Sequence, residues 1–175
     1  MEAGPGRIAF LINSLNHPDK KAIRQAADAL ISIAADFPDL PQQLEPLLDD
    51  KPAAKSWPVA YVLAQIAYPS SSCLRVLQEA LGSRDPDIRW AVLLLLARLG
   101  KKDHRISRLL LDLLKSGAPI QRRMAVYCLR DIDPKEAPFL PALLDSARDP
   151  DPLVRVAAVN SLKIQPDIGA DGLDR

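Results

Sequence analysis

Aromatic and cationic side chains recur at matching positions in the middle of this chain. Trp57, Trp90 and Arg123 succeed one another at intervals of 33 residues. Trp, Tyr and Arg dominate the hot spots of protein interfaces, because each combines a large contact area with a polar or charged end. The pattern therefore predicts a binding surface. The residues assigned to this surface are Trp57, Tyr61, Trp90, Leu94, Arg98, Lys101, Arg123, Tyr127 and Arg130.

Residues suited to catalysis or metal binding are few. His17 and His104 are the only histidines, and each lies where a turn or a helix start is expected. Cys73 and Cys128 lack the CxxC spacing of a metal or redox site. The sequence contains no phosphate-binding glycine loop, nucleophile elbow or HExxH motif. We expect no catalytic residue, no metal and no cofactor, and we favour a non-enzymatic role over an enzymatic one.

A 33-residue period defines the elements that must position these side chains. Each period contains two apolar series with the i, i+3, i+4 spacing of an amphipathic helix. The first helices share Leu11, Leu44, Leu77, Leu110 and Leu143, and the second helices share Leu30, Leu63, Leu96, Leu129 and Leu162. Self-similarity at such a period is typical of a solenoid, in which each repeat buries its apolar face against its neighbours.

The predicted fold is an all-α superhelix of five helix pairs, forming one domain over residues 1–175. The repeats are placed at about 4–36, 37–69, 70–102, 103–135 and 136–168, with a polar tail at 169–175. Pro46 lies inside the first helix of the second repeat, where it should kink or shorten that helix. Gln165 and Pro166 make the last repeat more polar, which is typical of a capping repeat.

Two segments begin their second helices in a closely similar way. They are Asp85-Pro86-Asp87-Ile88-Arg89 followed by Ala91-Val92, and Asp151-Pro152-Leu153-Val154-Arg155 followed by Ala157-Ala158. This pattern resembles the HEAT repeat, and more narrowly the short bacterial form found in phycobilisome lyase-like proteins. The resemblance implies a HEAT/armadillo-like solenoid with a ladder of Asp and Arg side chains between adjacent turns. The residues at ladder positions are Arg89, Arg122, Arg155, Asp85 and Asp151.

The second helices carry the aromatic residues on one face. When each residue advances the helical wheel by about 100°, both tryptophans and all three tyrosines lie opposite the core residues. In HEAT-like solenoids the second helices line the concave surface, so these rings are expected on the floor of a groove. The alternative is that the rings pack between neighbouring repeats. Both possibilities are open at the level of the sequence.

Charge is concentrated in the middle of the chain. The net charge is +1, whereas the third and fourth repeats carry +3 each. This distribution favours an acidic partner segment, and a solvated face without a specific partner is the alternative. The start of the chain does not resemble a signal peptide, and no apolar stretch is long enough to span a bilayer. We expect a cytoplasmic protein with no membrane partner.

These observations predict an interaction scaffold or adaptor that binds a protein or peptide on the concave face of the second helices. A nucleic-acid-binding protein resembling the HEAT-like alkylpurine DNA glycosylases is the alternative. The low net charge and the lack of a carboxylate beside the central aromatic residues disfavour it. A bilin lyase or chaperone-like subunit is a third possibility and rests only on the repeat subtype. No motif specifies the partner or the oligomeric state.

Overall fold

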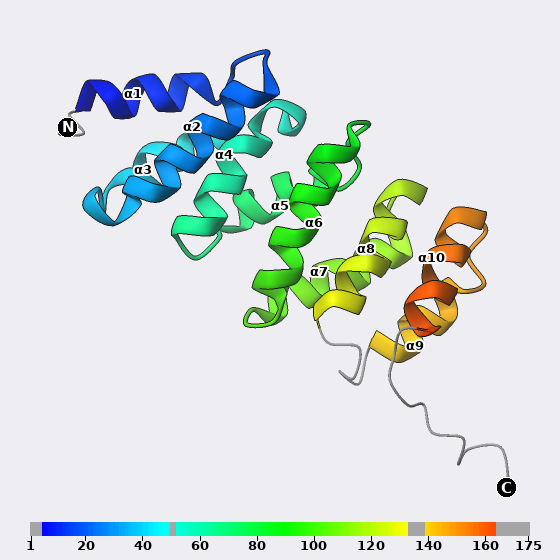
Figure 1. The fold of residues 1–175 in the computed structure, drawn as a ribbon. Helices are drawn as coiled ribbons and strands as arrows, with labels where there is room; N and C mark the ends of the chain where they lie inside the picture. Colours follow the sequence, from blue (N-terminus) through cyan, green and yellow to red (C-terminus); the bar gives the residue numbers. More distant parts are fainter. Residues whose placement is uncertain (1–4, 50–51, 133–138, 164–175) are drawn as a thin grey trace, which may run out of the picture. The chain divides into compact units, whose positions relative to one another are not determined.

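The computed structural model describes residues 5–49, 52–132 and 139–163, and every regular element in these ranges is a helix (Figure 1). Along the chain the helices follow the predicted order of five first and second helices: α1 (Pro5–Ser14) then α2 (Lys20–Ile33), α3 (Leu40–Leu44) then α4 (Ala53–Ile66), α5 (Ser71–Ala80) then α6 (Pro86–Gly100), α7 (His104–Ser116) then α8 (Pro119–Ile132), and α9 (Phe139–Ser146) then α10 (Pro152–Lys163). Two 3-10 helices, η1 (Ala34–Asp36) and η2 (Glu45–Leu48), follow α2 and α3. The predicted all-α class is confirmed.

The chain divides into two compact units, Met1–Ile88 and Arg89–Arg175, and the boundary lies inside α6. In the first unit, α2 packs against α1 and α4, and α4 packs against α5. In the second unit, α8 packs against α7 and α10, and α7 also contacts α9. Where α9 and α10 join the second unit, the first helices α7 and α9 therefore contact each other, and the second helices α8 and α10 contact each other.

Helix starts follow from the residues in the turns. Asp19 Oδ1 accepts a hydrogen bond from the backbone N–H of Lys21 at 2.9 Å, and Ser70 Oγ accepts one from that of Cys73 at 3.0 Å. These bonds satisfy N–H groups that have no partner within the helix. Helices α6, α8 and α10 each begin with proline. The N–H of a first helical residue has no partner within the helix, so proline loses no hydrogen bond at this position. The turns thus set the helix boundaries.

Pro46 has the predicted effect on the second repeat. Helix α3 ends after only five residues, and the chain continues as the 3-10 helix η2, with Pro46 in its first turn. Proline cannot donate the next α-helical hydrogen bond. Leu44 and Leu48 remain buried on the core side, so the shortened helix still fills its place in the repeat.

The apolar registers form the core. Leu30, Leu96 and Leu129 are fully buried, and Leu63 is nearly so. In the second unit, a cluster around Val126 joins α8 to α9 and α10. Two positions differ from the helical wheel: Ala64 and Ala97, which it places opposite the core, are buried. Gln165, Pro166 and the tail 169–175 lie outside the described residues.

Candidate binding surface

An aromatic pair joins α6 and α8 in the second unit. The rings of Trp90 and Tyr127 are stacked, with centroids 5.7 Å apart and planes 21° from parallel. The guanidinium carbon of Arg130 lies 5.2 Å from the centroid of the Tyr127 ring, within the range of a cation–π interaction. Three predicted site residues from two helices are therefore brought into one cluster.

This cluster is open to solvent on one side. Trp90 is 45% exposed and Leu94, one turn further along α6, is 62% exposed. Tyr127 is half-buried and packs against the core cluster around Val126. The sequence left exposure and packing between repeats as alternatives, and the stacked pair shows both. Tyr127 fixes one side of Trp90, while the rest of the indole and Leu94 face outward.

Cations border the aromatic cluster. Arg98 and Lys101 are exposed at the end of α6, and Arg123 and Arg130 are half-buried on α8. Arg130 forms an ion pair with Asp131, with Nε 2.6 Å from Oδ1, and this hydrogen bond raises the pKa of Arg130. Asp131 therefore offsets the charge of Arg130 on this surface.

The two predicted site residues of the first unit form a separate pair on α4. The rings of Trp57 and Tyr61 meet edge to face, with centroids 6.3 Å apart and planes at 73°. Trp57 also lines a pocket of about 460 Å³ between the turn before α2 and the start of α4. Its other lining residues are Leu15, Asn16, His17, Ile23, Pro52, Lys55 and Pro58. The spacing of aromatic residues did not indicate this pocket, because several of its residues come from turns.

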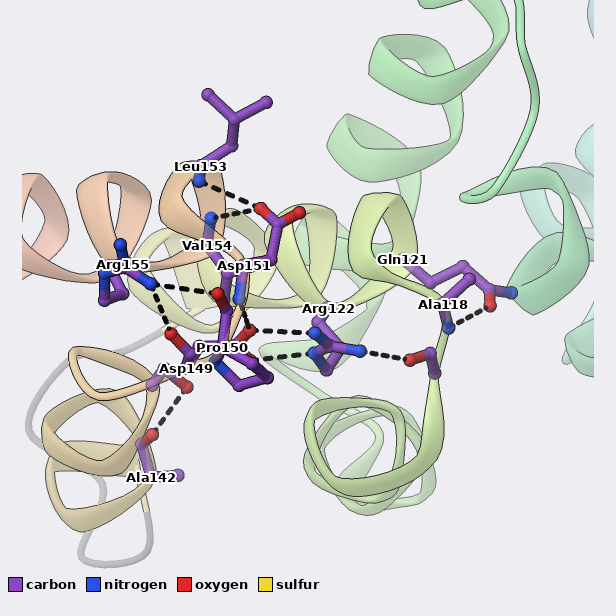
Figure 2. Close-up of polar contacts among 12 residues, drawn as sticks. Ala118, Gln121, Arg122, Ala142, Asp149, Pro150, Asp151, Leu153, Val154 and Arg155 are labelled. Carbon is purple, nitrogen blue, oxygen red and sulfur yellow. Dashed lines mark hydrogen bonds and ion pairs between the residues drawn. The ribbon is translucent and has the colours of Figure 1, made fainter.

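The Arg–Asp ladder is present with a different partner from the one that the resemblance implied. Arg122 binds Asp149 through two parallel contacts, Nε to Oδ2 at 2.7 Å and Nη2 to Oδ1 at 2.8 Å (Figure 2). Asp151 instead accepts hydrogen bonds from the backbone N–H groups of Leu153 and Val154, so it caps α10. One residue, Pro150, separates the two aspartates, and only the earlier carboxylate reaches back toward α8.

The other implied carboxylate also has another partner. Asp85 pairs with Lys20 across the first unit, with Nζ 2.5 Å from Oδ2. This contact lowers the pKa of Asp85 and raises that of Lys20, because the hydrogen bond favours the charged form of each group. In the ladder itself, Asp149 raises the pKa of Arg122, and Arg122 lowers the pKa of Asp149. These contacts stabilise the turns between helices.

The cysteines are unsuited to nucleophilic chemistry in the folded chain. Both are free and buried, and each thiol donates to a backbone carbonyl, that of Ala60 for Cys73 and that of Leu93 for Cys128. Burial raises the pKa of Cys73 to about 12 and also raises that of Cys128. Within the described residues, no three His, Cys, Asp or Glu side chains gather in a metal-binding arrangement, and no helix is long and apolar enough to cross a membrane.

Comparisons with known proteins agree with this architecture. Residues 106–171 match the family model described as HEAT repeats, and no curated protein matches the chain. A chain from the complex of CpcE and CpcF of phycocyanin lyase from Nostoc sp. PCC7120 has a TM-score of 0.64 at 20% identity, covering 91% of this chain and 99% of its own length. Two designed armadillo repeat proteins, one in complex with the peptide (KR)4, are 17% identical, with TM-scores of 0.43 and 0.42. They cover 90% of this chain and 81% and 82% of their own lengths. Residues 106–171 therefore match HEAT repeats, and the chain along most of its length shares the helical solenoid fold of the chain from the CpcE and CpcF complex.

Proposed function

We propose that this protein is a non-enzymatic interaction scaffold that binds an acidic protein or peptide segment on the outward face of α6 and α8. The observation that carries the proposal is the stacked Trp90–Tyr127 pair, which holds a large aromatic surface half in solvent. The part of the indole that faces solvent contributes no buried area to the folded chain. A partner that covers this indole and the adjacent Leu94 gains the free energy of removing both from water.

The free energy available from covering these two side chains is that of an interface hot spot. The exposed part of Trp90 corresponds to about 100 Å², and at roughly 25 cal/mol per Å² its burial contributes about 2–3 kcal/mol. Covering Leu94 adds about 1–2 kcal/mol. These gains offset part of the entropy lost on association. Trp90 is thus expected to be the main anchor, and Leu94 the second.

The charged groups on this surface favour an acidic partner. Lys101, Arg123 and Arg130 are basic residues on this surface, and Asp131 pairs with Arg130. Arg98 adds a further exposed cation on α6. Opposite charge on the partner accelerates association and selects against basic segments. Trp57 and Tyr61 form a second proposed contact patch in the first unit.

A peptide-display selection tests the proposal. Acidic amphipathic peptides selected on the full chain are measured by calorimetry against wild type, Trp90→Ala and Leu94→Ala. The matched control is Phe10→Ala, which removes another exposed ring, on α1 and outside the proposed surface. We expect Trp90→Ala to weaken binding by about 30-fold or more, and the control to change it by less than about threefold. Circular dichroism verifies that each variant keeps its helices.

Two results contradict the proposal. In the first, the selected peptides bind Trp90→Ala and Leu94→Ala as tightly as wild type. In the second, the protein selects no peptide but binds oligonucleotides with an affinity that falls steeply with salt, which would move the nucleic-acid alternative to first place. The same oligonucleotide titration, run with and without 0.5 M salt, therefore belongs to the experiment.

A further inference from the structure

The junction between α8 and α10 shows how this chain joins one repeat to the next. Arg122 on α8 binds the carboxylate of Asp149, which lies in the turn before α10, and its third nitrogen donates to the carbonyl of Gly117 at 2.8 Å (Figure 2). Both side chains of the pair are largely buried. Beside them, Val126 of α8 is fully buried against Val154 and Ala157 of α10. Arg122 and Val126 of α8 thus form the contacts with the following repeat, which contains α9 and α10.

The same positions recur 33 residues later on the last helix pair. Arg155 takes the place of Arg122, and its Nη1 donates to the carbonyls of Asp149 and Pro150 in its own turn, just as Arg122 donates to that of Gly117. Within the described part of the chain, however, Arg155 forms no ion pair with a carboxylate and acts on Asp149 only through its charge at a distance, and its side chain is exposed. The cation that forms the ladder is present, and the acid that would complete it is not among the described residues.

The apolar contacts show the same difference. Val159 on α10 occupies the position of Val126, yet it is 40% exposed where Val126 is fully buried. Leu144 on α9 occupies the position of the half-buried Leu111 and is 48% exposed. In an array of repeats, apolar residues at these positions contact the next repeat. We call the surface formed by Leu144, Arg155 and Val159 the end face.

We propose that the end face binds a further helix pair of the same repeat type, supplied by a partner protein, with Asp or Glu in the turn between its two helices. The acid of that turn would pair with Arg155 as Asp149 pairs with Arg122. Its helices would cover Leu144 and Val159 as α9 and α10 cover Val126. This surface lies outside the proposed binding surface on α6 and α8.

A second copy of this chain is a poorer match. In its first repeat, the position of Asp149 is occupied by His17. His17 Nδ1 already accepts a hydrogen bond from the backbone N–H of Asp19 at 3.0 Å, so in the neutral ring Nε2 carries the proton and is a donor. A donor cannot accept from the guanidinium of Arg155. Because His17 cannot pair with Arg155 as an aspartate would, the proposal favours a different protein over head-to-tail self-association.

An extended protein tests whether the end face accepts a repeat. A second copy of residues 136–168 is added after residue 168 of the full chain, so that an aspartate equivalent to Asp149 is offered to Arg155. We expect amide exchange in α10 to slow by at least tenfold relative to wild type. Changing that added aspartate to asparagine should reverse most of this protection. The matched control changes the added equivalent of Asp145, an exposed aspartate on α9, and should leave the protection intact.

Photo-crosslinking in cells tests for the partner. A photoreactive residue replaces Val159, and the crosslinked peptides are identified by mass spectrometry with and without Arg155→Glu. The proposal predicts crosslinks to an acidic turn between two helices of another protein, reduced at least tenfold by Arg155→Glu. Crosslinks only to residues 164–175 or to a second copy, crosslinks that Arg155→Glu leaves unchanged, or an added repeat that does not protect α10 would overturn it.

Discussion

Arg122 and Arg155 occupy the same position in successive repeats, and they should differ sharply in their contribution to the free energy of unfolding. We expect Arg122→Met to lower the free energy of unfolding by about 2–3 kcal/mol, because it removes three hydrogen bonds of 2.7–2.8 Å and leaves Asp149 unpaired. Breaking a fully buried pair costs about 3–5 kcal/mol. Here Arg122 is 15% and Asp149 8% exposed, and Asp149 keeps its hydrogen bond from the backbone of Asp151, so a value below that range is expected.

Arg155→Met is the matched comparison. This side chain is exposed and binds only carbonyls of its own turn among the described residues, so its loss should cost less than about 1 kcal/mol. Urea unfolding followed by circular dichroism measures both variants. Amide exchange in α9 and α10 is measured as well, because repeat proteins can open locally. In a double-mutant cycle, Arg122→Met with Asp149→Asn should give a coupling of at least about 1 kcal/mol. Equal losses for the two arginine variants would refute the assignment of Arg122 as the buried step of the ladder.

Three further predictions concern the core, the response to acid and the thiols. Leu129→Ala should cost about 2–5 kcal/mol in urea unfolding, because this side chain is fully buried in the register shared by the second helices. Arg122 lowers the pKa of Asp149 below its usual 3.8. The stabilisation from this carboxylate is therefore present above about pH 4 and is lost as the pH falls through the lowered pKa. Asp149→Asn should flatten this part of an acid-unfolding curve. Cys73 and Cys128 should not react with a thiol reagent at pH 8 in native protein, and both should react in urea; rapid modification of the native protein would contradict their burial.

The sequence predicts the helix pairs well, because a buried leucine every 33 residues constrains each helix independently. It also locates the short α3, since the effect of Pro46 on a helix is local. The partner of the ladder arginine could not be read in this way. Asp149 and Asp151 lie in one turn, and the backbone conformation of that turn decides which carboxylate caps α10 and which reaches α8.

The binding surface shows a similar limit. A helical wheel gives the direction of a side chain but not the distance between two helices, so the stacking of Trp90 on Tyr127 was not predictable. The wheel also gives no account of what flanks a helix, and for that reason it places the buried Ala97 on the outward side. The missed end face had a signal in the sequence: Leu144, Arg155 and Val159 repeat the types or positions of residues that face the next repeat.

The proposed binding surface on α6 and α8 and the end face both depend on the core cluster around Val126. Tyr127 packs against the cluster of Val126 and Ala157, which attaches α10 to α8. Truncation of Tyr127 would therefore disturb the support of α10 as well as the stacked pair, and a loss of peptide binding in that variant would have two explanations. Trp90 and Leu94 are exposed on α6 and lie outside that cluster. For this reason the peptide experiment relies on Trp90 and Leu94, and the test of the end face relies on Arg155.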